Sequence, residues 1–407
     1  PSHIEHIGIA VKNLDESINA FPYVNGKLFE ESLPPASFDS EMRNILLKCC
    51  ELDWGKISPA IFGSLFQSVM NPELRRNLGA HYTSEKNILK LIKPLFLDEL
   101  WAEFNKVKSN RKKLEEFHDK LASLKFLDPA CGCGNFLIIS YRELRMLELE
   151  ILKILFTNDE GDKQHVININ TIFKLDVDSY YGIECEEFPA RIAEVAMWLI
   201  DHQMNMKISE EFGLYFTRLP LKKGANMIIG NALRLDWNEI ISNNKLSYIL
   251  GNPPFIGKQH QNKEQKEDMD LLFNNVKGAG VLDYVTSWYI KASQYIQSKN
   301  IKVAFVSTNS IAQGEQVGIL WNELFNKYNI KIHFAHKTFK WNNEARGVAG
   351  VYVVIIGFAA FDAKNKILYE YDNPSSDAHE ISIKNINPYL VEGNDITILK
   401  RNHPICD

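Results

Sequence analysis

Residues 125–137 constrain the fold of this chain more than any other stretch. They read Lys-Phe-Leu-Asp-Pro-Ala-Cys-Gly-Cys-Gly-Asn-Phe-Leu: a short apolar strand that ends at Asp128, a turn with Gly132 and Gly134, and the start of an amphipathic helix over residues 136 to 156. Strand, glycine turn and helix form the first half-unit of a doubly wound nucleotide-binding fold, where glycines let a ligand lie against the backbone. The turn lacks the dinucleotide and P-loop fingerprints. It therefore favours a zwitterionic amino-acid group over a pyrophosphate, with a purely structural glycine turn as the alternative.

Three further strands are expected to end in polar residues at the same edge of the sheet. Residues 180–184 end at Glu184, residues 227–232 include Asn231, and a fourth strand leads to residue 252. A carboxylate after the second strand can accept hydrogen bonds from both hydroxyls of a ribose. Asn231 suits the edge of an adenine ring. The pattern predicts an α/β fold with a doubly wound, mostly parallel sheet, which binds its ligand at that edge.

The fourth strand runs into residues 247–255, which read Ser-Tyr-Ile-Leu-Gly-Asn-Pro-Pro-Phe. Pro253 and Pro254 fix their own φ angles, and Pro254 also restricts the residue before it, so the turn is rigid. The Asn252 side-chain carbonyl, the Pro253 backbone carbonyl and the Phe255 ring together suit a planar amino group, which the two oxygens hold while the ring stacks. The alternative is an ordinary exit from a strand into a loop.

Helical patterns flank this sheet on the amino-terminal side. Residues 41–52 and 57–70 have apolar positions at helical spacing and indicate a small helical annex. A later helix begins near Thr83 or Ser84, either of which is a natural N-cap. The amino end of a helix can hold a carboxylate, although a merely structural cap is the alternative.

The last third of the chain predicts the end of the sheet. Residues 301–310 form a fifth strand and residues 318–328 a helix. The strands 331–339 and 351–358 are joined by a loop too short for a crossover helix, so they should pair antiparallel. We expect the loop to expose Phe339 and Trp341 at the active edge, with burial as loop anchors as the alternative.

Composition narrows the functional classes. The six cysteines lack zinc spacing, so we expect free thiols and no metal. No apolar run reaches the roughly 18 residues that span a bilayer, and no signal pattern opens the chain, so we expect a cytoplasmic protein with no membrane partner. The net charge of −5 leaves DNA binding to local basic patches.

Two resemblances follow from these motifs. Residues 3–18 are similar to the opening strand and helix of the glyoxalase and methylmalonyl-CoA epimerase superfamily, in which His3 or His6 would bind a metal; nothing continues that fold after residue 20. From about residue 21 onward the chain resembles class I S-adenosylmethionine-dependent DNA adenine-N6 methyltransferases, and more narrowly the MmeI-like type IIL or IIG restriction-modification enzymes. The second resemblance rests on residues 62–97, 126–137 and 251–258.

The second resemblance implies a seven-stranded sheet with an N-terminal helical annex and S-adenosylmethionine as cofactor. It divides the chain into a foreign stretch (1–20), a helical spacer (21–78), a methyltransferase domain (79–365) and the start of a linker (366–407). Residues implied to line the methionine part of the cofactor are Asp128, Ala130, Gly132 and Gly134. Those implied to meet its carboxylate are Thr83, His81 and Tyr82. Glu184 is implied to bind the ribose, Cys185 to pack on the adenine, and Asn231 to replace the usual aspartate at the adenine amino group.

The same resemblance implies direct methyl transfer to a flipped adenine, with Asn252, Pro253, Pro254 and Phe255 as the catalytic turn. Phe255, Phe339 and Trp341 are the rings implied to stack on the base. No nuclease or target-recognition domain is visible in the sequence, so we expect these from elsewhere and expect only phosphate contacts from the basic residues Arg75, Arg76, Lys258, Lys263 and Lys340. Methylation of protein glutamine and a non-catalytic fragment of a restriction system are the alternatives.

Overall fold

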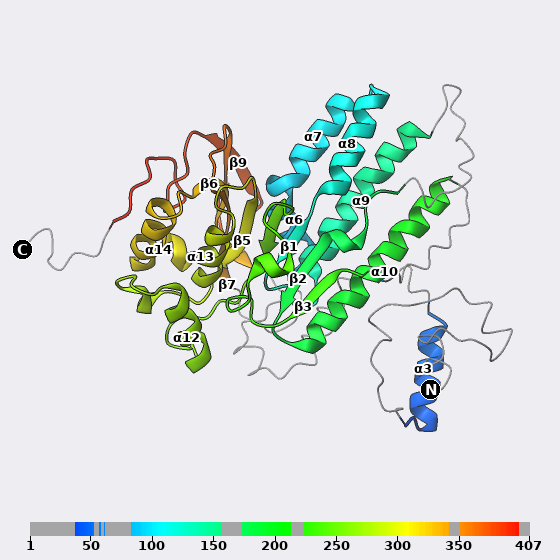
Figure 1. The fold of residues 1–407 in the computed structure, drawn as a ribbon, viewed down its shortest axis with the longest axis horizontal. Helices are drawn as coiled ribbons and strands as arrows, with labels where there is room; N and C mark the ends of the chain where they lie inside the picture. The colour runs from blue at the N-terminus through cyan, green and yellow to red at the C-terminus, as the bar shows by residue number, and fades with distance from the viewer. Residues whose placement is uncertain are drawn as a thin grey trace, which may run out of the picture.

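A nine-stranded sheet forms the centre of the molecule (Figure 1). The computed structural model describes residues 37–52, 57, 61, 83–156, 173–212, 224–341 and 351–398. The strands are β1 (Phe126–Asp128), β2 (Tyr180–Glu184), β3 (Asn226–Ile229), β4 (Tyr248–Gly251), β5 (Lys302–Thr308), β6 (Lys331–Trp341), β7 (Val351–Ala359), β8 (Lys366–Tyr371) and β9 (Ala378–Ile383). They lie in the order β3-β2-β1-β4-β5-β7-β6-β8-β9.

The first five strands are parallel, so their carboxyl ends meet at one edge. β7 pairs antiparallel with both β5 and β6, which confirms the predicted antiparallel pair. The predicted α/β class is therefore correct, but the predicted count of seven strands is wrong. β8 pairs parallel with β6, and β9 pairs antiparallel with β8. Residues 366–383, which we expected to be a linker, thus extend the same sheet.

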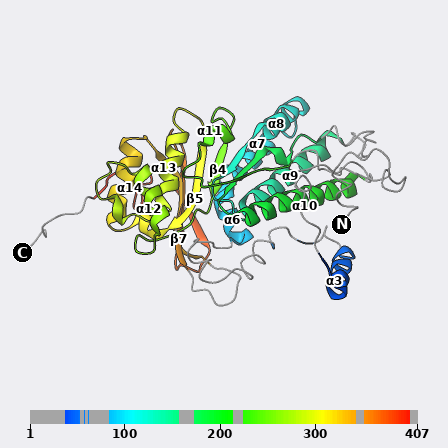
Figure 2. The same cartoon turned by 60° about the horizontal axis from the view of Figure 1, so that its bottom comes forward.

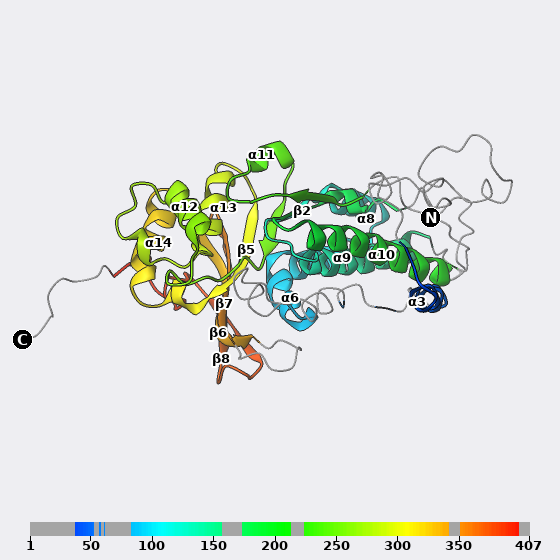
Figure 3. The ribbon, with the colours of Figure 1, turned by 90° about the horizontal axis from the view of Figure 1, so that it is seen from below.

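Helices cover both faces of the sheet. On one side lie α6 (Glu85–Ile92), a π-helical turn (Lys93–Leu97), α7 (Asp98–Val107), α8 (Arg111–Ser123), α9 (Asn135–Leu155) and α10 (Glu187–Phe212). On the other lie α11 (Trp237–Ile240), α12 (Lys263–Leu272), α13 (Thr286–Tyr295) and α14 (Glu315–Asn326). Figure 3 shows the two groups on opposite sides of the strands. Short 3₁₀ turns occupy Val177–Ser179, Ala279–Val281 and Asn309–Ala312.

Alternation along each strand builds a separate core on each face. Phe126 of β1 is buried against the α6–α10 side, while Leu127, the next residue, is buried against the α11–α14 side. In β4, Leu250 and Ile249 divide between the two cores in the same way. Strands buried on both faces are held rigidly, and so are the turns that follow them.

Most predicted helices are confirmed where the structure describes them. The helix expected at 41–52 is α3 (Ser40–Cys50), which buries none of its residues and lies apart from the sheet in Figure 2. The helix expected after the glycine turn is α9. The helix expected at 57–70 falls mostly outside the described residues, and the histidines of the first twenty positions fall wholly outside them. Across the described part of the chain, no helix has the length and hydropathy to cross a membrane.

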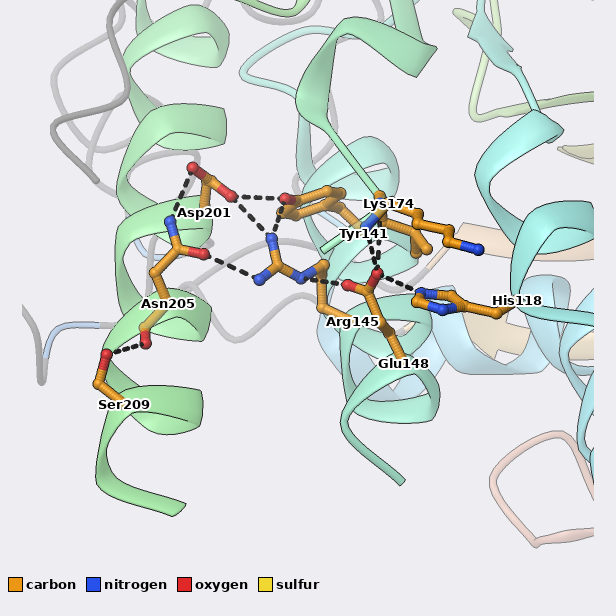
Figure 4. A network of polar contacts seen from close by, with 9 residues as sticks. His118, Tyr141, Arg145, Glu148, Lys174, Asp201, Asn205 and Ser209 are labelled. Carbon is orange, nitrogen blue, oxygen red and sulfur yellow. Dashed lines mark hydrogen bonds and ion pairs between the residues drawn. The ribbon is translucent and has the colours of Figure 1, made fainter. Parts of the chain in front are cut away.

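A buried polar network fixes α9 against α10 and α8 (Figure 4). The guanidinium of Arg145 pairs with Asp201 Oδ1 at 2.9 Å and with Glu148 Oε2 at 3.0 Å, and all three side chains are almost wholly buried. His118 Nε2 contacts Glu148 Oε1 at 2.8 Å. Burial alone would raise the pKa of Glu148, but the His118 hydrogen bond and the Arg145 charge hold it below its ordinary value. The network orients α9, whose first turn lies at the carboxyl edge of the sheet.

Candidate functional site

The turn after β4 is held in one conformation by a buried carboxylate. Asp283 Oδ1 accepts hydrogen bonds from the backbone N–H of Ile256 at 3.0 Å and of Val285 at 3.1 Å. The carbonyl of Ile256 in turn accepts from the N–H of Tyr284 at 3.0 Å and from Gln261 Nε2 at 3.1 Å. Residues 252–255 therefore lie between a buried strand and a fully bonded anchor, which fixes where their side chains are presented.

The side-chain oxygen of Asn252 is an acceptor for which the described residues offer no donor. Its Nδ2 donates to Thr83 Oγ1 at 3.2 Å, whereas its Oδ1 is buried and has no hydrogen-bond partner in the described part of the chain. A buried polar atom without a partner costs about 1–3 kcal/mol, so such atoms in native proteins call for an explanation. A ligand with an N–H group would remove that cost.

Asp128, at the end of β1, is a second buried acceptor. Its side chain is 1% exposed, Oδ1 accepts from the Ala130 N–H at 3.0 Å, and Oδ2 has no partner among the described residues. Burial, together with the nearby charge of Glu184, raises the pKa of Asp128 to about 8, although the hydrogen bond from the Ala130 N–H opposes the rise. A Cβ on Gly251 of β4 would lie 2.5 Å from Asp128 Oδ1, so this close packing requires glycine there.

Gly132 and Gly134, the two glycines of the turn, are required for different structural reasons. Both have positive φ, +53° for Gly132 and +83° for Gly134, which L side chains rarely adopt. A Cβ on Gly134 would lie 2.9 Å from the Cβ of Ala193 in α10, so Gly134 lets α9 and α10 approach closely. A Cβ on Gly132 would meet no described atom within 4 Å. The Gly132 position therefore leaves open space beside the backbone.

Glu184 links this turn to the end of β2. Its Oε2 accepts from the Gly132 N–H at 2.8 Å, and its Oε1 accepts from the Glu186 N–H at 3.1 Å and from the Cys185 thiol at 3.2 Å. The structure therefore brings together the acid of the second strand and the glycine turn of the first. Cys185 is exposed beside them.

Asn231 follows β3 by two residues and is already hydrogen bonded. Its Oδ1 accepts from the Leu233 N–H at 2.9 Å, and its Nδ2 donates to Asp268 Oδ2 at 2.9 Å. The Asn231 amide is thus oriented by the protein itself, and Oδ1 keeps one lone pair for a further donor.

The expectation of exposed aromatics after β6 is wrong. Phe339 is 1% exposed and Trp341 is 2% exposed, and both belong to β6 itself. The Phe339 ring stacks on the Tyr371 ring of β8, with the two ring centroids 5.1 Å apart. Lys90 of α6 places its Nζ 4.1 Å from the centroid of the Phe339 ring. β8 and α6 therefore cover the ring. Phe255 is half-buried and packs against both cores.

The structure describes only some of the residues predicted near the start of α6. Thr83 is buried and accepts a hydrogen bond from Asn252, whereas Ser84 is the N-cap of α6 without a side-chain cap bond. His81, Tyr82, Arg75 and Arg76 lie outside the described residues.

Sequence reasoning missed three residues that the structure places in the site. Asp283 anchors the turn after β4, and Asp268 holds Asn231. Asn135, the first residue of α9, is 9% exposed, and its Oδ1 has no partner where the structure describes the surroundings. Only Asn135 had a local signal, its position directly after the glycine turn. Nothing in the sequence distinguishes the two aspartates from their acidic neighbours.

Comparisons with known proteins agree with one another. The family described as "MmeI, DNA-methyltransferase domain" matches residues 104–370. "DNA methyltransferase A" of Bacillus subtilis (strain 168) is 43% identical over 395 residues, which cover 96% of this chain and 43% of that protein. The solved structure of the type IIL restriction-modification enzyme MmeI in complex with DNA has a TM-score of 0.93 and 57% identity, over 100% of this chain and 54% of that chain.

A more distant structure shares the fold alone. The type IIG restriction endonuclease BpuSI has a TM-score of 0.50 and 14% identity, over 91% of this chain and 38% of that chain. This chain spans about half or less of the length of each of these relatives.

Proposed function

This chain belongs to the MmeI DNA-methyltransferase family, and on that premise we propose that it transfers a methyl group from S-adenosylmethionine to the N6 amino group of an adenine in DNA, within a restriction-modification system. The observation that carries the proposal is the buried Oδ1 of Asn252, which has no hydrogen-bond partner among the residues that the structure describes. A planar amino group supplies the donor that this oxygen lacks, and the Pro253 backbone carbonyl can accept the second amino hydrogen.

The residues around the glycine turn fit S-adenosylmethionine. Asp128 Oδ2 is buried without a partner among the described residues, and a bound ammonium group would favour the ionised carboxylate and supply its missing donor; Gly132 leaves space for a ligand against the described backbone. Thr83 Oγ1 accepts from Asn252 and keeps its own hydrogen to donate to a carboxylate. The residues proposed to hold the cofactor are Thr83, His81, Tyr82, Asp128, Ala130, Gly132, Gly134, Glu184, Cys185 and Asn231.

The chemistry requires positioning more than acid or base groups. When bound, S-adenosylmethionine supplies an activated methyl group, so no covalent enzyme nucleophile is needed. Asn252 Oδ1 and the Pro253 carbonyl hold both amino hydrogens, raise the electron density on nitrogen and aim its lone pair. The nitrogen gains the methyl group and loses one hydrogen as a proton. Preorganised acceptors of this kind are typically worth about 10²–10³ in rate.

The amino group of a paired adenine is inaccessible inside the duplex, so the base must be flipped at a cost of a few kcal/mol. Phe255 lies three residues after Asn252 in the anchored turn and is the ring proposed to stack on the flipped base. The buried rings of Phe339 and Trp341 are not proposed for this role, since β8 and α6 cover the first and the second is equally enclosed.

Target recognition is proposed to come from outside residues 1–407. Lys258, Lys263 and Lys340 are exposed and suit phosphate contacts, which carry no sequence information. We expect weak, salt-sensitive binding of DNA by this chain. A gel-shift assay that found tight, sequence-specific binding would contradict this part of the proposal.

Transfer of a labelled methyl group tests the reaction directly. The chain is incubated with labelled S-adenosylmethionine and mixed-sequence DNA, and the DNA is digested to nucleosides. We expect the label in N6-methyladenine. A parallel reaction on a glutamine-containing peptide addresses the alternative, because a carboxamide presents a similar planar NH₂ group. Label in the peptide but not in the DNA would contradict the proposal, and calorimetric binding of the cofactor with label in neither substrate would favour the alternative of a non-catalytic fragment.

A further inference from the structure

A buried carboxylate on α12 accepts hydrogen bonds from two other segments of the chain, the loop after β3 and the residues before α13. Asp268 is 1% exposed. Its Oδ1 accepts from Arg234 Nε at 2.6 Å, and its Oδ2 accepts from the Tyr284 hydroxyl at 2.7 Å and from Asn231 Nδ2 at 2.9 Å. Among these described partners of Asp268, only Asn231 has a role in the proposed function. Its position therefore needs its own explanation.

The Asn231 amide has its direction fixed by two partners of opposite character. An ionised carboxylate only accepts hydrogen bonds, so Asp268 selects the NH₂ end of the amide. The Leu233 backbone N–H only donates, so at 2.9 Å it selects the oxygen end. A free asparagine can turn its amide over at little cost, but here the turned amide would oppose a donor to a donor and an acceptor to an acceptor. Oδ1 is thereby kept as an acceptor.

Tyr284 connects the same carboxylate to the catalytic turn. The Tyr284 hydroxyl donates to Asp268, while the Tyr284 N–H donates to the Ile256 carbonyl at 3.0 Å. The preceding residue, Asp283, accepts from the Ile256 N–H at 3.0 Å. One dipeptide thus holds the end of the turn after Asn252 and, through Asp268, the amide of Asn231.

We propose that Asp268 is a positioning residue that fixes the Asn231 amide as an acceptor for the amino group of the cofactor's adenine ring and ties that end of the site to the catalytic turn. The inference rests on the proposed function, because it takes the cofactor's adenine to lie at Asn231. It predicts a preference for a 6-amino purine over a 6-oxo purine, since the oxygen of hypoxanthine would face Asn231 Oδ1.

Binding measurements that involve no methyl transfer test this. Calorimetry compares S-adenosylhomocysteine with S-inosylhomocysteine, which carries a 6-oxo group in place of the 6-amino group. We expect the protein to prefer the adenine compound by at least about tenfold, the value of one hydrogen bond that is lost and left unpaired. In Asp268→Asn the new amide can either donate to or accept from Asn231, so only the Leu233 N–H still opposes the turned amide, and the preference should fall below about threefold.

An exchange of the two side chains provides the rescue. Asn231→Asp alone places two carboxylates against each other at the 2.9 Å contact and should weaken binding of both compounds. Asn231→Asp combined with Asp268→Asn restores one donor and one acceptor with the polarity reversed, and it should recover the preference for adenine. Glu267→Gln is the matched control. The substitution also removes one negative charge near Arg234, whose Nη2 lies 3.6 Å from Glu267 Oε2, but it leaves the contact between residues 268 and 231 in place. It should leave the preference unchanged.

The outcomes distinguish failure of the proposed function from failure of the role proposed for Asp268. Failure of the wild-type chain to bind S-adenosylhomocysteine would overturn the proposed function and this inference together. Binding with a preference for adenine that Asp268→Asn retains would overturn the inference alone. If Asp268→Asn does not fold, the comparison of Asn231→Asp with the double variant decides, since a merely structural role predicts no recovery of preference.

Discussion

Asp128 is expected to make the stability of the chain depend on pH in an unusual direction. Most carboxylates in proteins are more acidic when folded, but Asp128 is 1% exposed and accepts one hydrogen bond from the described residues. Burial and the charge of Glu184 together raise its pKa to about 8. In the unfolded chain the same carboxyl has an ordinary pKa of about 4.

The size of the effect follows from this difference. Between pH about 4 and about 8 the folded chain keeps a proton on Asp128 that the unfolded chain has released. The stability that this group contributes is therefore greatest below pH about 4 and is lost as the pH rises to about 8, at up to about 1.4 kcal/mol per pH unit. Asparagine cannot ionise, so Asp128→Asn removes this slope.

Urea unfolding at about pH 5, 6, 7 and 8 measures the difference in the free energy of unfolding between the wild type and Asp128→Asn. We expect the stability of the variant relative to the wild type to increase with each step. Asp119→Asn is the control: a hydrogen bond from Lys174 lowers the pKa of the exposed Asp119, so its difference from the wild type should stay constant over this range. A constant difference for Asp128→Asn as well would refute the reasoning.

Three further substitutions test packing, charge and the buried aromatic. Gly251→Ala places a Cβ 2.5 Å from Asp128 Oδ1 and should cost about 1–3 kcal/mol in urea unfolding, whereas Gly257→Ala, with open space around it, should be nearly neutral; equal effects would contradict the packing argument. Arg145→Met leaves two buried carboxylates without their cation and should cost about 3–5 kcal/mol, so an unchanged unfolding midpoint would show that the network is dispensable. Phe339→Ala should destabilise by about 3–5 kcal/mol; a variant of wild-type stability with weakened DNA binding would instead favour a stacking role.

Local patterns predicted the parts of the site that are local in the chain. The strand, glycine turn and helix around Gly132 follow from residue types at fixed spacing, and so does the rigid turn after Gly251. The contact between Asn231 and Asp268 joins residues 37 positions apart, on a short strand exit and on a charged helix. No periodicity reports such a contact, because it depends on how α12 packs.

The error at Phe339 has a definite physical cause. An aromatic residue near the end of a strand is exposed only if nothing lies beyond that strand. We expected Phe339 to stand at the start of an exposed loop and residue 366 to begin a linker, so no element was expected to cover the ring. Instead β8 pairs with β6 and places Tyr371 against the ring, while Lys90 of α6 covers it from the helical side. Because β8 was not predicted, Phe339 was wrongly expected to be exposed.

The central claim is that Asn252 Oδ1 holds the amino group that is methylated, and the rate of methyl transfer in Asn252→Ala tests it most directly. Single-turnover transfer to DNA and calorimetric binding of S-adenosylmethionine are measured together for the wild type, for Asn252→Ala and for the control Asn322→Ala, an exposed asparagine on α14. We predict that Asn252→Ala slows transfer by about 100-fold or more while the dissociation constant of the cofactor stays within about threefold. Transfer at the wild-type rate by Asn252→Ala would contradict the claim.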